Sequence, residues 1–195
     1  GEAALVLCGE SWVRVYGHEE FHLHFHNLME IGICRQGVGD MYFDEEVYKY
    51  HSGDITIIPE NFPHVTVSDG ETTNFWEYIF IDLRSMIETM FPGNVAFQND
   101  AVSSLSKRAY MTNERDNHII AECINGIIRE TNEHKTYSQR AIALKVQEIV
   151  IELLRHDASL PEEKNNLVKG TNMSQIASAL YYINKHFKDQ LKACE

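Results

Sequence analysis

The sequence of 195 residues lacks paired cysteines, long apolar runs and a secretory signal, and each lack excludes a class of protein. Its four cysteines lie far apart with no C-x-x-C pair, which excludes a dense disulfide framework and a thiolate zinc site. No apolar run approaches the roughly 18 residues that a membrane-spanning helix needs. Because the amino terminus has no basic segment followed by a long apolar core, we expect a cytoplasmic protein that spans no membrane.

Basic residues are scarce in the first half of the chain. The whole chain has 17 Lys and Arg against 29 Asp and Glu, which gives a net charge of −12. Residues 1–100 hold 4 basic and 17 acidic residues, a net charge of −13, whereas residues 101–195 have a net charge of +1. Because a surface this acidic repels phosphate groups, we expect the first half to bind no nucleic acid by itself.

Short aromatic and β-branched runs, separated by turn residues, extend from Trp12 to about Leu83. Gly and Pro in the intervening segments supply the backbone angles that turns need. The pattern is typical of antiparallel sheet, and such strands close most economically as a barrel or as a two-sheet sandwich. The expected strands are residues 21–26, 29–35, 41–43, 47–50, 55–58, 64–67 and 75–83.

In the second half, apolar residues recur every three and four positions, which predicts two amphipathic helices at 117–133 and 138–156. We expect these helices to form a hairpin. Their apolar stripes could merely cover the predicted strands. Because the stripes are longer than one hairpin buries on itself, we expect instead a homodimer with an outward apolar position such as Ile149 in its contact. Residues 157–171 have the composition of a linker, and a third helix is expected from Asn172 onward.

Histidines alternate along the first predicted strand. Because side chains alternate in a strand, three of them share one face: His22, His24 and His26. Glu30 follows in the next run, and His64 comes just after a proline-containing turn. Imidazole and carboxylate groups suit Zn, Ni, Fe or Mn, with positions left open for water or substrate. The predicted metal ligands are His24, His26, Glu30 and His64; the alternative is that they bind one another or a small molecule without a metal.

The aromatic run at 75–80 belongs first of all to the core, with one ring expected to face a ligand. Trp76, Tyr78 and Phe80 share one face of the predicted strand. Both faces of the run are apolar, so the sequence does not show which one points inward. Trp76 and Tyr78 are therefore candidate ligand contacts together with the histidines and Glu30.

The spacing of these residues resembles the cupin family. Gly17 and His24-x-His26-x3-Glu30-x6-Gly37 resemble its first motif, and Gly53-x5-Pro59-x4-His64 resembles its second. Asn61 stands where the second motif usually has Gly, and Ser68 where it often has Asn. These departures weaken membership in the enzyme-type cupins more than they weaken the fold. The resemblance implies a mostly β protein with C-terminal helices, built as a single cupin β-barrel (a double-stranded β-helix) followed by the helical hairpin. His22 falls outside the motif and is expected at the rim.

The order of barrel, two helices and third helix resembles the amino-terminal part of AraC/XylS-type bacterial transcription regulators. The segment from Ile176 to Lys188 is similar to the first helix of that family's DNA-binding domain. The resemblance implies an effector-binding barrel at 1–112, a dimerising hairpin at 113–157, and a linker with the first DNA-binding helix at 158–195. DNA would be contacted only through helix-turn-helix units following Glu195.

Two functions of different classes fit the sequence. The first is a ligand-sensing and dimerising regulatory domain that is not an enzyme and responds to a small polar molecule such as a sugar, whose hydroxyls pair with polar groups and whose ring face stacks on an aromatic. The second is a cupin metalloenzyme of the dioxygenase or sugar isomerase type. The third predicted helix favours the regulator, because a free-standing enzyme has no use for it.

Overall fold

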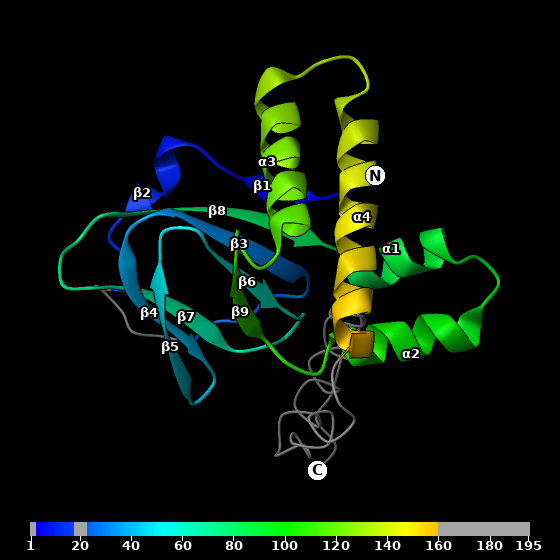
Figure 1. The fold of residues 1–195 in the computed structure, drawn as a ribbon, viewed down its shortest axis with the longest axis horizontal. Helices are drawn as coiled ribbons and strands as arrows, with labels where there is room; N and C mark the ends of the chain where they lie inside the picture. The colour runs from blue at the N-terminus through cyan, green and yellow to red at the C-terminus, as the bar shows by residue number, and fades with distance from the viewer. Residues whose placement is uncertain (1–2, 18–22, 160–195) are drawn as a thin grey trace, which may run out of the picture. The chain divides into compact units, whose positions relative to one another are not determined.

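Two antiparallel sheets enclose the interior of residues 3–17 and 23–159, which are the parts of the chain that the computed structural model describes (Figure 1). The larger sheet has the order β1-β8-β3-β6-β9, and β2 also pairs with β8; the smaller has the order β5-β4-β7. The larger sheet consists of β1 (Leu5–Leu7), β2 (Val13–Arg14), β3 (Met29–Gln36), β6 (Asp54–Ile58), β8 (Asn74–Ile81) and β9 (Tyr110–Asn113). The smaller consists of β4 (Val38–Phe43), β5 (Glu46–His51) and β7 (His64–Ser68).

Six of the seven predicted strands are confirmed to within a few residues, and the exception is the histidine run at 21–26. Of its described residues, 23–26, only His24 pairs, in an isolated bridge with His64. The described residues therefore show two separate ladders and no closed barrel. The physical reason is that one bridge at His24 does not continue the hydrogen-bonded ladder of the smaller sheet into the larger one.

The larger sheet is buried on both faces, which explains why its strands look apolar throughout. Ile31, Ile33, Ile79 and Ile81 belong to a core shared with the helices, whereas Cys34, Trp76 and Tyr78 belong to a core shared with the smaller sheet. Alternation along β8 therefore turns Trp76 and Tyr78 toward the space between the sheets.

Helices α3 (His118–Glu133) and α4 (Ser138–Ser159) confirm the two predicted helices, with α4 ending three residues later than expected. They lie side by side against the larger sheet (Figure 1). Their apolar stripes are covered inside a single chain, and Ile149 is 0% exposed. Ile149 is therefore not an outward residue, because α1, α2 and α3 pack against α4 and bury it in the shared core.

Two further helices, α1 (Leu83–Met90) and α2 (Val95–Leu105), lie between β8 and β9 in the chain. Asp82 accepts a hydrogen bond from the Ser85 amide, and Asn94 accepts one from the Phe97 amide, so each helix begins at a side-chain cap. In the described residues, no helix is long and apolar enough to cross a bilayer. The predicted linker beyond residue 159 and the predicted third helix lie outside the described residues.

Candidate functional site

A cavity of about 410 Å³ opens between the sheets. Its walls come from the amino-terminal segment, residues 23–26, β3, β7 and β8, which are far apart in the sequence. Aromatic and aliphatic side chains form most of the wall, and four titratable groups gather in one part of it. The lining residues are Leu7, Trp12, Tyr16, Gly17, His24, His26, Glu30, His64, Val65, Thr66, Tyr78 and Phe80.

Three of the predicted site residues form the polar end of this cavity. Glu30, on β3, is 4% exposed, and its Oε2 lies 2.9 Å from Nε2 of His26 and 3.6 Å from Nε2 of His64. His64 is the first residue of β7 and is 1% exposed. One possible metal-binding atom from each of the three lies within 4.8 Å of those of the other two. We call His26, Glu30 and His64 the polar trio.

Backbone carbonyls orient both imidazoles of the polar trio. Nδ1 of His26 lies 2.7 Å from the carbonyl oxygen of Leu28, and Nδ1 of His64 lies 2.8 Å from that of Phe62. Because a carbonyl oxygen only accepts, each Nδ1 carries a proton and donates it. The neutral form of each ring therefore presents an unprotonated Nε2 toward Glu30.

Charges in the polar trio stabilise one another. Burial opposes ionisation of Glu30, but the imidazoles of His26 and His64 outweigh it and lower the pKa of the carboxyl to about 2. Burial would likewise lower the pKa of His26, but the hydrogen bond to Glu30 and the charge of that carboxylate raise it above its usual value. When His26 is protonated, its Nε2 donates a hydrogen bond to the Glu30 carboxylate across the 2.9 Å contact.

Nε2 of His64 is buried without a hydrogen-bond partner among the described residues. The Oε2 of Glu30 nearest to it is too distant, at 3.6 Å, for a hydrogen bond. A buried polar atom without a partner is costly, so such an atom at a cavity wall points to a bound group that completes it.

The remaining sequence-predicted residues are distributed differently. His24 lines the cavity with its ring centroid 4.4 Å from that of His64, but it is not part of the trio whose ligand atoms converge. Tyr78 also lines the cavity. Trp76 does not: it is fully buried beneath Tyr78, with the two rings stacked at 6.0 Å. His22 lies outside the described residues.

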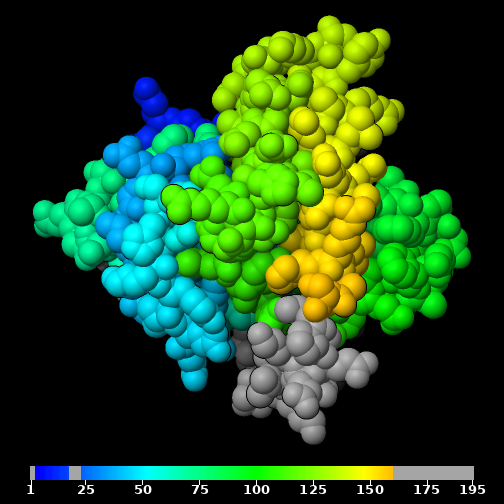
Figure 2. All heavy atoms as spheres, in the orientation of Figure 1, coloured from blue at the N-terminus to red at the C-terminus, as the bar shows by residue number. Residues whose placement is uncertain are grey.

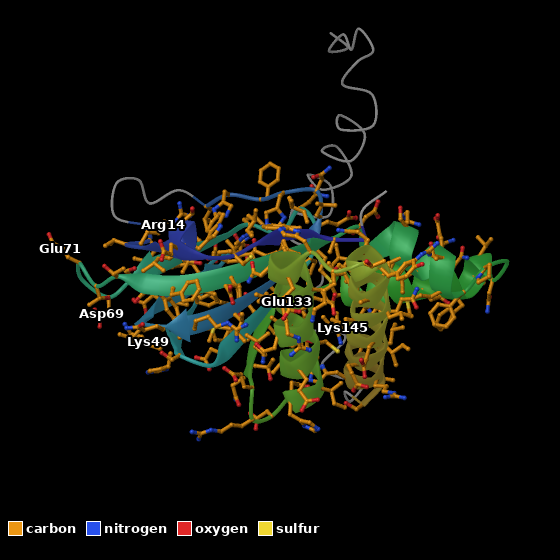
Figure 3. The ribbon with its side chains drawn as sticks, turned by 90° about the horizontal axis from the view of Figure 1, so that it is seen from above. Arg14, Lys49, Asp69, Glu71, Glu133 and Lys145 are labelled. Atoms are coloured by element: carbon orange, nitrogen blue, oxygen red, sulfur yellow. The ribbon has the colours of Figure 1, made fainter. Side chains whose placement is uncertain are left out.

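Several cavity residues were not found by sequence reasoning. Trp12 and Tyr16 come from the amino-terminal segment, and the Trp12 ring meets that of Tyr78 edge-on at 5.3 Å. Arg14 lies on β2 (Figure 3) and is not among the residues that line the cavity. Its guanidinium carbon lies 4.7 Å from the ring centroid of Trp12 and 4.7 Å from that of Tyr16. The sequence could have identified Phe80 as a cavity residue, because it shares one strand face with Trp76 and Tyr78. The positions of Trp12 and Tyr16 depend on contacts with residues distant in the sequence.

Ser68 holds the amino-terminal segment against the sheet. Its hydroxyl accepts a hydrogen bond from the Tyr16 amide at 2.9 Å, and its own amide donates to the Tyr16 carbonyl at 3.0 Å. Gly17 follows with a φ of 74°, and a Cβ there would lie 2.8 Å from the Val67 side chain. Only glycine fits both restrictions, so this wall of the cavity depends on Gly17.

Comparison with known proteins gives one family. The family model for the AraC-like ligand binding domain matches residues 14–154. Among solved structures, the AraC-like transcriptional activator CuxR has a TM-score of 0.52 and 14% identity, over 86% of this chain and 54% of CuxR. Apo ToxT K231A from Vibrio cholerae has a TM-score of 0.56 and 10% identity, over 98% of this chain and 68% of ToxT. Wild-type ToxT bound to an unsaturated fatty acid has a TM-score of 0.51 and 12% identity, over 97% of this chain and 64% of ToxT.

At sequence identities of 10–14%, the structural likeness shows only that this chain shares a fold with these proteins. The chain spans between 54% and 68% of the lengths of these three solved proteins. No curated protein matches the sequence.

Proposed function

Because this chain belongs to the family of AraC-like ligand-binding domains, we propose that it is the effector-sensing part of a bacterial transcription regulator acting in the cytoplasm. The observation that carries the proposal is the buried polar trio, with its unpartnered His64 Nε2, at the wall of a cavity of about 410 Å³. That volume lies within the roughly 300–1,000 Å³ of small-molecule sites. Residues 1–112 would bind the effector, 113–157 would dimerise, and 158–195 would connect to the DNA-binding units.

The mechanism is a shift between two arrangements of the domain. An effector in the cavity touches Trp12 and Tyr16 of the amino-terminal segment as well as β3, β7 and β8. It therefore favours the arrangement in which that segment closes the wall, and it changes how a paired DNA-binding domain is held. Only an effector that binds the two arrangements with different affinity has this effect.

A small polar molecule such as a sugar is the effector class proposed from the sequence. Its hydroxyls would donate to Glu30 and to Nε2 of His64, and its ring face would stack on Trp12. The candidate contacts are His24, His26, Glu30, His64 and Tyr78, to which the cavity lining adds Trp12 and Phe80. Trp76 is retained only as the support beneath Tyr78.

A thermal-shift screen with sugars and other small metabolites tests the effector proposal. We expect at least one compound to raise the melting temperature in a saturable way, and Phe80→Ala to weaken that binding at least about tenfold by removing a ring of the cavity wall. Phe25→Ala is the matched control, because Phe25 is 47% exposed and outside the cavity lining. A compound that binds equally well to the Phe80→Ala variant binds elsewhere and contradicts the proposal.

A divalent metal is the second candidate occupant of the polar trio, and the donor set fits one. Nε2 of His26, Nε2 of His64 and the Glu30 carboxylate would hold it, and hydrogen bonds from each Nδ1 to a backbone carbonyl are the usual support of metal-binding imidazoles. His24, a fourth ligand in the sequence-based set, is next to His64. When bound, Zn, Ni, Fe or Mn would polarise an oxygen of a bound molecule. The three converging donor atoms are thus also the observation that favours a cupin metalloenzyme as the alternative function.

Elemental analysis of protein purified without chelators tests the metal. If the trio holds a metal, one equivalent is expected in the unmutated protein and none in the His64→Ala variant. His51→Ala is the matched control, since His51 is exposed on β5. Full metal content in the His64→Ala variant argues against this occupant. The absence of metal from the unmutated protein, after Zn, Ni, Fe and Mn have each been supplied, argues against it as well. Turnover of a substrate by the metal-loaded protein would favour the enzyme over the sensor.

We place the proposed dimer contact on the outer face of α4, since Ile149 is buried. Tyr137, just before α4, and Leu144 and Ile151 within it recur every seven residues and are 79%, 66% and 38% exposed. Figure 2 shows the surface of α4 (yellow) uncovered over much of its length. Seven-residue spacing of apolar residues is the pattern by which two helices pack along one seam.

Sedimentation tests the dimer. The unmutated chain is expected to sediment as a dimer at micromolar concentration, and Leu144→Asp as a monomer, because an unpaired charge in a dimer core is costly. Val95→Asp is the control, since Val95 is a similarly exposed apolar residue, at 63%, on α2. A monomer for the unmutated chain, or a dimer for Leu144→Asp, contradicts this interface.

A further inference from the structure

The outer face of α4 has two charged side chains beside its apolar row. The row consists of Tyr137, Leu144 and Ile151, which are spaced seven residues apart with Leu144 in the middle. Arg140 lies four residues before Leu144 and Glu148 four residues after it, and both are exposed. Because four residues turn an α-helix by about 400°, each lies only about 40° around the axis from Leu144, one on either side of the row.

Neither of these two charges is balanced inside the described parts of the chain. Arg140 and Glu148 take part in none of the ion pairs among residues 3–17 and 23–159. The Glu148 carboxylate accepts a hydrogen bond from the Cys123 thiol of α3 at 3.2 Å, which leaves its charge without a cation. Farther along α4, by contrast, Arg155 pairs with Glu152. The exposed face of α4 therefore has one positive and one negative charge, placed symmetrically about Leu144, that a partner could balance.

A second copy of α4 balances both charges in one orientation. When two identical helices pack antiparallel about Leu144, residues equally far before and after it face each other, so Arg140 meets Glu148 of the partner subunit on both sides of the two-fold axis. At roughly 8–10 Å between packed helix axes, these two side chains are long enough to form an ion pair. In the parallel orientation each residue faces its own copy, which places Arg against Arg and Glu against Glu and disfavours that pair.

The apolar row accepts the antiparallel alignment but does not require it. In that alignment Leu144 packs on its own copy at the two-fold axis, and Tyr137 packs on Ile151 of the partner subunit, seven residues away on either side. A parallel pair would also match apolar residues with apolar residues, each with its own copy. The two charges are therefore the feature of this face that distinguishes the orientations.

We infer that two copies of the chain pair through α4 in antiparallel orientation about Leu144, with Arg140 of each subunit forming an ion pair with Glu148 of the partner subunit. The inference rests on the proposed dimer and adds its alignment, which seven-residue spacing alone leaves open. Because the two-fold axis repeats the ion pair, reversing one charge in the sequence alters two contacts in the dimer.

Sedimentation of charge-reversed variants tests the ion pair. Arg140→Glu and Glu148→Arg should each raise the dissociation constant of the dimer about tenfold, because each turns two attractive contacts into repulsive ones. The double variant Arg140→Glu/Glu148→Arg exchanges the charges and should dimerise within about threefold of the unmutated chain. In a parallel pair neither single variant would change the signs that face each other. Arg115→Glu is the matched control, since Arg115 is exposed in the turn after β9, and it should leave the dissociation constant unchanged.

Thiol cross-linking tests the orientation without changing a charge. Cys8 and Cys194 are first replaced by Ser in the 195-residue chain, which leaves only two cysteines, Cys34 and Cys123, both of which are buried. Single cysteines are then introduced at the two ends of the apolar row, and each variant is treated with a short bismaleimide, alone and in an equimolar mixture of the two. This readout does not depend on whether Glu148→Arg folds.

The antiparallel pair predicts cross-links in the mixture alone. Two copies of Tyr137→Cys, or two copies of Ile151→Cys, would place their thiols about 21 Å apart, whereas the thiols of one copy of each would be neighbours. We therefore expect covalent dimers only when the two variants are mixed. Val95→Cys is the control, since Val95 is 63% exposed on α2, and it should cross-link neither with itself nor with the other variants.

The outcomes distinguish this alignment from the proposed dimer and from the proposed sensor. Cross-linking of Tyr137→Cys or Ile151→Cys with itself overturns the inference but leaves α4 as the dimer contact. Single charge reversals that dimerise as tightly as the unmutated chain overturn it as well. A dimer that cross-links in no combination uses another face, and a monomeric unmutated chain contradicts both the alignment and the dimer. Effector binding in the cavity is decided separately by the thermal-shift screen.

Discussion

Glu30 is the side chain on which the polar end of the cavity depends. It lies on the inward face of β3, opposite Ile58 of β6 and Phe80 of β8, so the sheet holds its backbone from both sides. A buried carboxylate is stable only when it is paired, and the two imidazoles supply that pairing. The same arrangement that prepares the cavity for a ligand therefore also contributes to folding stability.

The free energy of unfolding should depend on pH through the ionisation of Glu30. Its pKa is lowered from 4.5 to about 2 in the folded protein, so its contribution is complete above pH 4.5 and is lost as the pH falls toward 2. The difference corresponds to about 3 kcal/mol. In urea unfolding between about pH 5 and pH 2, Glu30→Gln should therefore lose less free energy of unfolding than the unmutated protein.

An exposed carboxylate provides the control for this prediction. Glu71 lies in the turn before β8 and is exposed, so Glu71→Gln should keep the pH dependence of the unmutated protein (Figure 3). The same loss of stability in Glu30→Gln as in the unmutated chain would show that the carboxylate contributes nothing in this pH range.

Asn74 joins both sheets at the other end of the interior. It is fully buried. Its amide nitrogen has two hydrogens to donate among three acceptors within hydrogen-bond distance, the Val38 carbonyl and the Tyr50 and Ser68 hydroxyls, and its oxygen accepts from the Val38 amide. Asn74→Ala leaves these groups without partners and should lower the free energy of unfolding by about 3 kcal/mol in urea titration. Asn125→Ala, at an exposed position of α3, should change it by less than about 0.5 kcal/mol. A loss below about 1 kcal/mol for Asn74→Ala would contradict this role.

At the scale of elements, α4 has one face in the core and one face outside. Ile149 is 0% exposed, whereas Leu144, five residues earlier, is 66% exposed. Five residues turn an α-helix by about 500°, which brings the two side chains well apart around the axis. A core residue and a candidate contact residue therefore follow each other closely on one helix.

Ile149→Asp should unfold the chain and not merely separate subunits. Burying a carboxylate among apolar side chains costs more than about 3 kcal/mol, so we expect lost helical circular dichroism or a much lower urea midpoint. Leu144→Asp should leave the free energy of unfolding of the subunit within about 1 kcal/mol of its starting value. A stable, folded Ile149→Asp monomer would refute the burial of this residue.

At the scale of the whole molecule, the charge distribution should prevent DNA binding by this chain alone. Residues 1–100 have a net charge of −13, which repels the phosphate backbone. We expect no binding to duplex DNA at micromolar protein and about 150 mM salt in fluorescence anisotropy. Binding with a micromolar or lower Kd that weakens as salt is added would contradict this expectation.

Much of the fold could be predicted from the sequence because its signals are local. Turn residues bound the strands of the two sheets, and apolar spacing at three and four marks α3 and α4. Histidines and apolar residues alternate regularly in the run at 21–26, as in a strand. Of its described residues, however, only His24 forms a β-bridge, with His64. Alternation states which side chains share a face, but it does not state whether a neighbouring strand is present to complete the ladder.

The sequence by itself determined the mostly antiparallel fold with C-terminal helices, the family, and the spacing that brings His26, Glu30 and His64 to one site. Only the tertiary structure decided that Tyr78 lines the cavity while Trp76 lies beneath it, that Trp12 and Tyr16 close its wall, and that Ile149 is covered. The physical reason is how far apart in the sequence the interacting residues lie. Periodicity and motif spacing are properties of neighbouring residues, whereas inward direction, burial and an unpartnered imidazole nitrogen depend on atoms that packing brings together from distant parts of the chain.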